Sequence, residues 1–292
     1  EFCSVVPMSG NRCRYKPVEN IAKEIETAIN IEKKFIFFTD DNFISNRPLS
    51  KKLIKKISEF KVMYLVQVPI SVADDDELLE LFAESKCRRF VIGMESLSNS
   101  SLKQMNKAKC NNVEEYAEKI EKIQSYGMEA QGSFILGCDG DDENVFENMV
   151  EFIDATNLSE PVLNVLTPYP GTRLFNRMKQ ENRLLHTDWS RYDTTNVCFE
   201  PKLMSPAVLQ NGYTWVRQQV YSYDAIFKRL KYLWNLWMLI DILLIIFWIL
   251  SRLSNKISFT IIKIVRISSL FKVLVLMNGL NTLIHAVLLA FP

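Results

Sequence analysis

The feature that most constrains this chain is a repeated alternation between amphipathic segments and short, almost wholly apolar ones. Residues 17–34 have helical start signals and an apolar stripe, and the next five, Phe-Ile-Phe-Phe-Thr at 35–39, are apolar up to the last residue. Such short apolar runs are typical of strands buried on both faces of a parallel sheet. The same order recurs and predicts strands at residues 62–68, 90–93, 129–137 and 162–167, with helices at 49–60, 75–85, 112–125 and 142–155.

This order predicts an α/β fold. Each crossover is long enough for a right-handed unit, so five parallel strands are expected to curl toward a barrel. One further strand is expected upstream of residue 1. We therefore predict a partial (β/α)6 TIM-like barrel that lacks its first strand over residues 1–167, then an α-helical extension over residues 168–227 that caps the barrel.

Charge is distributed unevenly along the chain. The net charge of the 292 residues is +1, but residues 228–292 carry eight basic side chains against one acidic, and the 227 residues before them carry 27 basic against 33 acidic. An acidic body does not favour nucleic acid as a partner. A basic, apolar tail suits an anionic lipid surface.

The tail, residues 228–292, is predicted to form hydrophobic, membrane-associated helices. Residues 233–250 would be about 27 Å long as a helix, barely enough for a hydrocarbon core of roughly 30 Å, and Asp241 lies in their middle. A crossing there would carry several cations across the membrane, against the positive-inside tendency. We therefore expect a cytoplasmic protein whose tail lies on the membrane, with two crossings or a buried helical core as alternatives.

The six cysteines are scattered and include no CxxC pair, which is typical of reduced thiols rather than a disulfide framework. Cys87 and Cys110 are expected at helix ends. Cys138 lies beside an acidic turn, without a neighbour at metal-ligand spacing. The two histidines, His186 and His285, are too few for a histidine-based metal site.

Polar residues gather where the predicted strands end, and in a barrel the chemistry lies at that edge. Helix caps and turns would use the same residue types, but four such places on one edge favour a functional site. The polar residues at the strand ends are Asp40, Asp41 and Asn42, then Glu95 and Ser96, then residues 137–141, and finally residues 168–172.

A second group of residues follows the last predicted strand. These residues could cap the substrate cavity or serve ordinary packing: Tyr169, Arg173, Trp189, Arg191 and Tyr192.

Five motifs together resemble the radical S-adenosylmethionine (SAM) enzymes, over roughly residues 1–225. More narrowly, they resemble the branch that often carries an amino-terminal cobalamin-binding domain, including hopanoid and bacteriochlorophyll-type enzymes. The sequence does not begin with Met and looks like a fragment that starts inside a CxxxCxxC motif. The motifs are Glu-Phe-Cys at 1–3, Phe-Thr-Asp-Asp-Asn-Phe at 38–43, Ile-Gly-Met-Glu-Ser at 92–96, Gly-Ser-Phe-Ile-Leu-Gly at 132–137 and Thr-Pro-Tyr-Pro-Gly-Thr-Arg-Leu-Phe at 167–175.

The resemblance implies a role for nine residues. Cys3 would be the third cysteine ligand of a 4Fe-4S cluster, and Phe2 beside it would pack on the adenine of SAM. One thiolate cannot replace the three that hold such a cluster, so this fragment alone is expected to be inactive. The remaining implied cofactor contacts are Asp40, Asp41 and Asn42 for the amino group, Glu95 and Ser96 for the ribose or methionine part, and Ile135 and Gly137 for the adenine pocket.

The implied activity is reductive cleavage of SAM to a 5′-deoxyadenosyl radical. An electron donor such as ferredoxin or flavodoxin would supply the electron, and cobalamin, bound through a missing amino-terminal domain, would methylate a lipid or other hydrophobic small molecule. Two alternatives stay open. One is a metal-independent barrel enzyme that uses Asp40, Asp41 and Glu95 as acids and bases. The other is a membrane-tethered, degenerate barrel that binds without catalysis.

Overall fold

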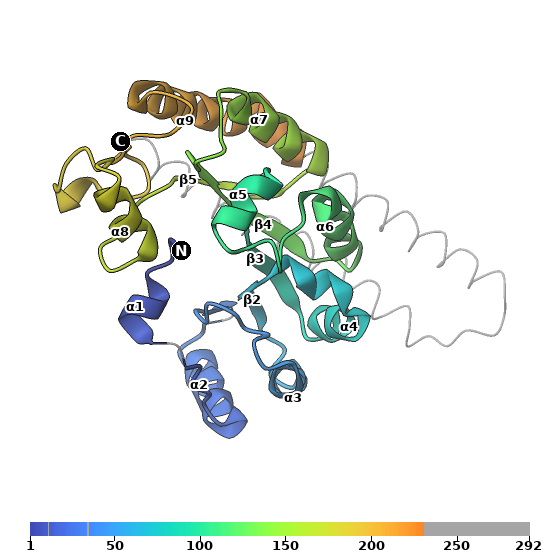
Figure 1. Cartoon of the computed structure of the whole chain (residues 1–292). Helices are drawn as coiled ribbons and strands as arrows, with labels where there is room; N and C mark the ends of the chain where they lie inside the picture. The colour runs from blue at the N-terminus through green and yellow to red at the C-terminus, as the bar shows by residue number, and fades with distance from the viewer. Residues whose placement is uncertain (11, 34, 231–292) are drawn as a thin grey trace, which may run out of the picture. The chain divides into compact units, whose positions relative to one another are not determined.

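Five parallel strands form the centre of the structure, a computed structural model that describes residues 1–10, 12–33 and 35–230 (Figure 1). The strands lie side by side in the order in which the chain makes them. Every connection is therefore a single step to the neighbouring strand, as expected for right-handed crossover units. This confirms the predicted α/β class with a curled, parallel sheet. The strands are β1 (Phe35–Phe38), β2 (Met63–Val68), β3 (Cys87–Glu95), β4 (Glu129–Leu136) and β5 (Val162–Val165).

Helices flank one face of the sheet in an arc (Figure 1). Side-chain caps fix where two of them begin: Asn46 accepts a hydrogen bond from Leu49 N–H, and Asp75 accepts one from Leu78 N–H. Each helix turns an apolar stripe inward and buries it. The helices of this arc are α2 (Val18–Asn30), α3 (Arg47–Ser58), α4 (Asp76–Glu84), α6 (Tyr116–Ser125) and α7 (Asn144–Thr156).

The two faces of the sheet differ in burial. On the helix-facing side, Tyr64 and Val66 of β2 and Phe90 and Ile92 of β3 are fully buried, and the Phe90 ring meets Phe82 of α4 with centroids 4.8 Å apart. The alternate residues point to the opposite face, which we call the concave face, and most of them are half-buried. The core therefore lies between sheet and helices, and the concave face is left for other contacts.

Several short elements were not predicted from the sequence. Helix α1 (Val5–Ser9) precedes the expected elements, and helix α5 (Asn99–Gln104) and the 3-10 turn η1 (Ile70–Asp74) lie between them. A second 3-10 turn, η2 (Val113–Glu115), forms the start of the segment predicted as a helix at residues 112–125. Strand β3 begins at Cys87, three residues before the predicted start. The expectation that Cys87 sits at a helix end is therefore wrong, because it is a buried strand residue.

Residues that follow β5 form α8 (Arg173–Gln180), η3 (Trp189–Arg191) and α9 (Pro206–Val220). Helix α9 lies beside α7, while α8 lies near the amino terminus (Figure 1). Gly212 of α9 lets the two helices approach, since a Cβ there would lie 2.2 Å from the Phe146 ring.

The predicted membrane-associated tail lies outside the described residues from position 231 onward. Among residues 1–10, 12–33 and 35–230, no helix combines the length and the apolar character needed to cross a membrane.

Candidate functional site

The carboxyl ends of the five strands meet at one side of the sheet, which we call the carboxyl edge. Parallel strands necessarily bring these ends together. The residues after β1 (Asp40, Asp41 and Asn42), the end of β3 (Glu95) and the residue after β4 (Gly137) all lie on this edge. The structure therefore brings these candidate residues to one edge, and their roles as cofactor contacts stay predictions.

Glu95 is the most unusual residue of the carboxyl edge. It has a left-handed backbone, with φ of 67°, at a shift in register between β3 and β4. It is 7 % exposed, and its carboxylate folds back over Gly93, where an added Cβ would lie 2.6 Å from Glu95 Oε1. Strained backbone of this kind persists where the surroundings enforce it and is concentrated at functional sites.

Neighbouring side chains hold the end of β3 in this conformation. Asn111 Nδ2 donates to the carbonyl oxygens of Gly93 and Met94, at 2.9 and 3.0 Å, and the Tyr116 hydroxyl donates to Met94 O at 2.7 Å. All four residues are partly or fully buried. These hydrogen bonds hold the backbone from which the Glu95 side chain projects.

Lys107 connects Glu95 to the amino-terminal segment. Its Nζ lies 2.9 Å from Glu95 Oε1 and 5.8 Å from the centroid of the Phe2 ring. The three side chains come from β3, from the loop after α5 and from the start of the chain. Sequence reasoning missed Lys107, because nothing in the local sequence shows that this loop returns to the end of β3.

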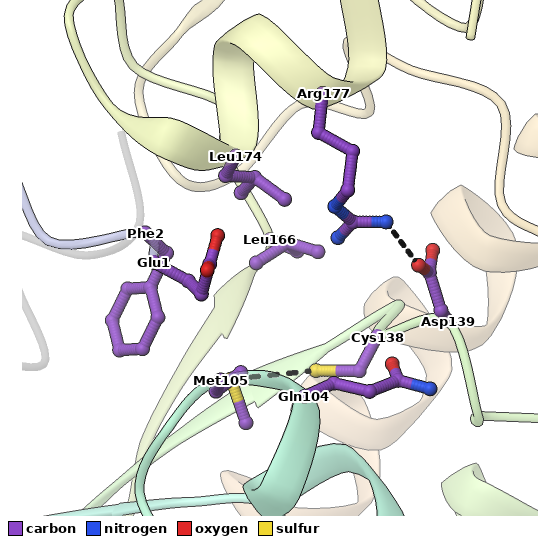
Figure 2. A pocket seen from close by; sticks show the side chains of 9 residues that line it. All are labelled: Glu1, Phe2, Gln104, Met105, Cys138, Asp139, Leu166, Leu174 and Arg177. Carbon is purple, nitrogen blue, oxygen red and sulfur yellow. Dashed lines mark hydrogen bonds and ion pairs between the residues drawn. The ribbon is translucent and has the colours of Figure 1, made fainter.

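The amino-terminal segment is docked onto α8. Leu174 N–H donates to Glu1 O at 3.1 Å, and Phe2 packs against the core. A small cavity of ≈ 10 Å³ remains between this segment and the carboxyl edge (Figure 2). Cys3 follows Phe2 directly in the chain, and its side chain is exposed.

A metal cluster would need more thiolates than this edge offers. Within the described ranges, no group of three or more His, Cys, Asp or Glu side chains is close enough to hold a metal ion. Iron–sulfur clusters of the 4Fe-4S type are held by several thiolates. The described residues, with Cys3 alone, therefore do not form a cluster site by themselves.

The loop after β4 is held from within by Asp141. Its carboxylate accepts from Gly137 N–H at 3.0 Å, from Cys138 N–H at 2.9 Å and from Ser101 Oγ at 3.1 Å. Burial raises the pKa of Asp141 to about 6, against the opposing effect of these hydrogen bonds. Gly137 itself has φ of 92° and leaves no room for a side chain, because a Cβ would lie 2.5 Å from Leu209.

Cys138 is a packing residue in the same loop. It is 3 % exposed, and its Sγ lies 3.8 Å from Met105 Sδ. Burial raises the pKa of the Cys138 thiol well above its usual value. The thiol is therefore not poised to bind metal.

Asp139 ties the carboxyl edge to the region after β5. Its buried carboxylate pairs with Arg183 at 2.8 Å, with Lys202 at 3.3 Å and with Arg177 of α8 (Figure 2). Burial by itself raises the pKa of Asp139, but the hydrogen bonds from Arg183 and Arg177 outweigh it and hold the pKa below its usual value. Arg177 and Lys202 also border an open pocket of ≈ 340 Å³ that reaches Glu1.

The other predicted site residues make no contact with the Glu95–Lys107 pair among the interactions of the described residues. Asp40, Asp41 and Asn42 are exposed after β1, and β2 separates them from β3. Asn42 Oδ1 accepts from Ile44 N–H at 3.2 Å, and Ser96 Oγ accepts from Ser98 N–H at 3.0 Å, so both shape turns. Ile135 is 8 % exposed near the end of β4.

The predicted substrate cap divides into packing and exposed residues. Tyr192 is buried, its hydroxyl donates to His186 O at 2.7 Å, and its ring meets Trp189 with centroids 5.0 Å apart. Trp189 is 53 % exposed, Arg173 and Arg191 are exposed, and Tyr169 is half-buried. Tyr192 thus serves as a structural support.

Comparison with curated proteins identifies methyltransferases as relatives. The chain is 32% identical over 234 residues to bacteriochlorophyllide d C-12(1)-methyltransferase of Chlorobaculum tepidum, a match that covers 79% of the chain and 50% of the relative. It is 30% identical over 195 residues to hopanoid C-2 methylase of Rhodopseudomonas palustris, covering 64% and 37%. The chain spans about half the length, or less, of these relatives.

Comparison of structures and family models supports the same relationship. The radical SAM methyltransferase TsrM of Kitasatospora setae, solved with cobalamin and a [4Fe-4S] cluster, has a TM-score of 0.53 at 15% identity, over 70% of this chain and 41% of that one, which supports a common fold. A domain of unknown function (DUF4070) matches residues 172–241. The radical SAM superfamily model matches residues 1–153, more than half of the chain, and the protein therefore belongs to the radical SAM superfamily.

Proposed function

We propose that the protein is a cobalamin-dependent radical SAM methyltransferase and that its carboxyl edge binds SAM. One observation carries the proposal: Glu95, a buried carboxylate on a strained backbone, is paired with Lys107, whose Nζ also lies over the ring of Phe2, the residue before the exposed Cys3. Membership of the superfamily and the methyltransferase relatives support the reaction class.

The residues at this edge fit the chemical groups of SAM. The cofactor carries an ammonium group, a carboxylate, a ribose diol and an aromatic adenine. Glu95 offers a carboxylate, Lys107 an ammonium group and Phe2 a ring face, and charge-assisted contacts of this kind are stronger than neutral ones. When bound, the cluster, SAM and cobalamin would supply the electron, the 5′-deoxyadenosyl radical and the methyl group.

The protein's own residues orient the cofactor and exclude water. Leu166 and Leu174 close the space behind Phe2 (Figure 2), and an apolar wall limits quenching of a reactive intermediate. Asp141 fixes the loop at Gly137 that would face the adenine. Cys3 is assigned as one ligand of the cluster.

The proposal is tested with full-length protein reconstituted anaerobically with iron and sulfide. We expect 5′-deoxyadenosine to form when SAM and a reductant, dithionite or reduced flavodoxin, are present, and we expect Cys3→Ser to lose both bound iron and product. Cys13→Ser is the matched control, because Cys13 is also exposed and has no assigned role. A wild-type protein with its full iron content and no 5′-deoxyadenosine would contradict the proposal.

We also infer membrane association from the sequence of residues 228–292, which is basic and apolar. The partner would be an anionic membrane surface on the cytoplasmic side. Sedimentation of the full-length protein with vesicles that contain phosphatidylserine should exceed that with phosphatidylcholine vesicles. Equal sedimentation with both kinds of vesicle, or with neither, would refute this inference.

A further inference from the structure

Two glutamine side chains lie in one layer of the concave face. Gln67 of β2 is aligned with Val91 of β3, and Val91 is aligned with Gln131 of β4. Their burial pattern and that of their neighbours place both amides on the side of the sheet away from the helices. Strands are about 4.8 Å apart, so the two glutamines face the same space from either side of Val91.

Both amides are left without a hydrogen bond from any residue that the structure describes, although both side chains are half-buried. On the same face, Asn164 Nδ2 lies 3.3 Å from Phe134 O. The two glutamine amides are not among the fully buried polar atoms that lack a partner, so water reaches them. Gln67 and Gln131 therefore offer donors and acceptors that a ligand could take over from water.

The layer lies between the carboxyl edge and an ion cluster at the opposite end of the strands. Val91 is four residues before Glu95, which is about 13 Å along a strand. At the other end, Arg89 pairs with Glu129 at 2.7 Å and with Glu160. A molecule that enters beside Glu95 would meet the two amides before it reached this ion cluster.

We propose that Gln67 and Gln131 are specificity-determining residues that hold a substrate bearing hydrogen-bonding groups, such as carbonyl, amide or hydroxyl groups, rather than a plain hydrocarbon chain. The inference rests on the proposed function and names the class of substrate for the same site. A hydrocarbon chain would cover both amides without replacing the hydrogen bonds they make to water, which is unfavourable. This departs from the expectation of a lipid substrate.

The strength of such selection follows from the chemistry of hydrogen bonds. A site that hydrogen-bonds a substrate group can reject an analogue that lacks the group by about 10⁴-fold, whereas one methylene more or less in an apolar pocket changes binding by roughly 10–200-fold. Loss of one amide is expected to weaken retention of the substrate by at least about 10-fold.

The test uses Gln67→Leu and Gln131→Leu, which keep most of the side-chain volume and remove the amide. Gln67→Met and Gln131→Met serve as second variants if a leucine variant unfolds. Gln218→Leu is the matched control, because Gln218 is exposed on α9. Circular dichroism on heating verifies that each variant is folded.

Each full-length protein is incubated with the aqueous or the chloroform phase of a cell extract, passed through a desalting column and examined by mass spectrometry for retained compounds. We expect the wild type and Gln218→Leu to retain a compound from the aqueous phase, and the Gln67 and Gln131 variants to retain at least about 10-fold less. Retention from the chloroform phase only, retention of nothing, or equal retention by all variants would overturn the proposal.

Formation of 5′-deoxyadenosine by the wild type without extract is measured separately. Its absence would indicate that the proposed function has failed, while its presence with unselective retention would indicate that only the assignment of the glutamines has failed.

Discussion

The substitution Gly93→Ala tests whether the position of the Glu95 carboxylate matters for SAM binding. Gly93 does not have a left-handed backbone, so alanine is compatible with its conformation. The obstacle is space, because the new Cβ would lie 2.6 Å from Glu95 Oε1, whereas ordinary contact begins at 3.4 Å. The carboxylate would have to move by about 0.8 Å, the difference between these two distances.

That movement would break the contact with Lys107. Oε1 is the atom that lies 2.9 Å from Lys107 Nζ, and a shift of this size away from it exceeds hydrogen-bonding distance. A hydrogen bond to a charged group contributes about 1.5–3 kcal/mol, which corresponds to roughly 10–150-fold in affinity. Lys107 is partly exposed, so we expect the lower part of this range for SAM affinity.

The fold itself should tolerate the change. Replacing glycine by alanine where the backbone permits it stabilises by about 0.4–1 kcal/mol, which offsets the strain at the flexible carboxylate. Gly132→Ala is the control, because its Cβ points toward the helices and would lie 3.0 Å from both Met94 Sδ and the Phe134 ring. We expect Gly132→Ala to lower the melting temperature and leave SAM affinity unchanged.

The assay is equilibrium dialysis of radiolabelled SAM against full-length protein, with thermal unfolding measured on the same samples. We expect Gly93→Ala to melt within a few degrees of the wild type and to bind SAM at least about 10-fold more weakly. Wild-type affinity in Gly93→Ala would refute the reasoning, as would an equal loss of affinity in both variants.

Three further predictions concern the carboxyl edge. Because the folded state raises the pKa of Asp141 from 3.8 to about 6, the stability this group contributes is present below pH 3.8 and is lost as the pH rises through 6. Asp141→Asn should therefore raise the free energy of unfolding at pH 7 by up to about 3 kcal/mol. Urea unfolding should also show that this free energy depends less on pH in the variant, and an unchanged pH dependence would disprove the prediction. Asp139→Ala should lower the free energy of unfolding by about 3 kcal/mol, because Arg183 would stay buried without its carboxylate partner. A decrease of less than about 1 kcal/mol would show that Arg183 finds another partner. Cys138→Ala should keep the full iron content in reconstituted protein, since its thiol is buried, and loss of iron would make Cys138 a ligand.

The sequence predicted the order of the strands because apolar runs at sheet positions differ clearly from amphipathic helices. It did not predict the start of β3, where Cys87, Arg88 and Arg89 look unlike a strand. They extend the strand because Arg89 finds its partners, Glu129 and Glu160, only in the folded sheet. Pairing between distant residues of this kind leaves no periodic signal in the local sequence.

The site was predicted in part for a related reason. Strand ends are visible in sequence, so Glu95 and Asp40 were expected where the structure has them, at the carboxyl ends of β3 and β1; their roles stay predictions. Lys107 was missed because its contact with Glu95 depends on how the loop after α5 returns. Gln67 and Gln131 were read only as strand residues, since their common layer depends on the register of three strands.

The docking of Glu1 onto Leu174 sets an order of assembly. The ribosome makes the amino-terminal segment first, but the N–H group that receives it belongs to a residue 173 positions later. Until α8 has been synthesised and folded, the hydrogen bond that holds the segment around Cys3 cannot form. For the cluster ligand that we propose at Cys3, metal loading would then be a late event, and nascent chains that end before residue 172 should be cut readily by protease between residues 3 and 17.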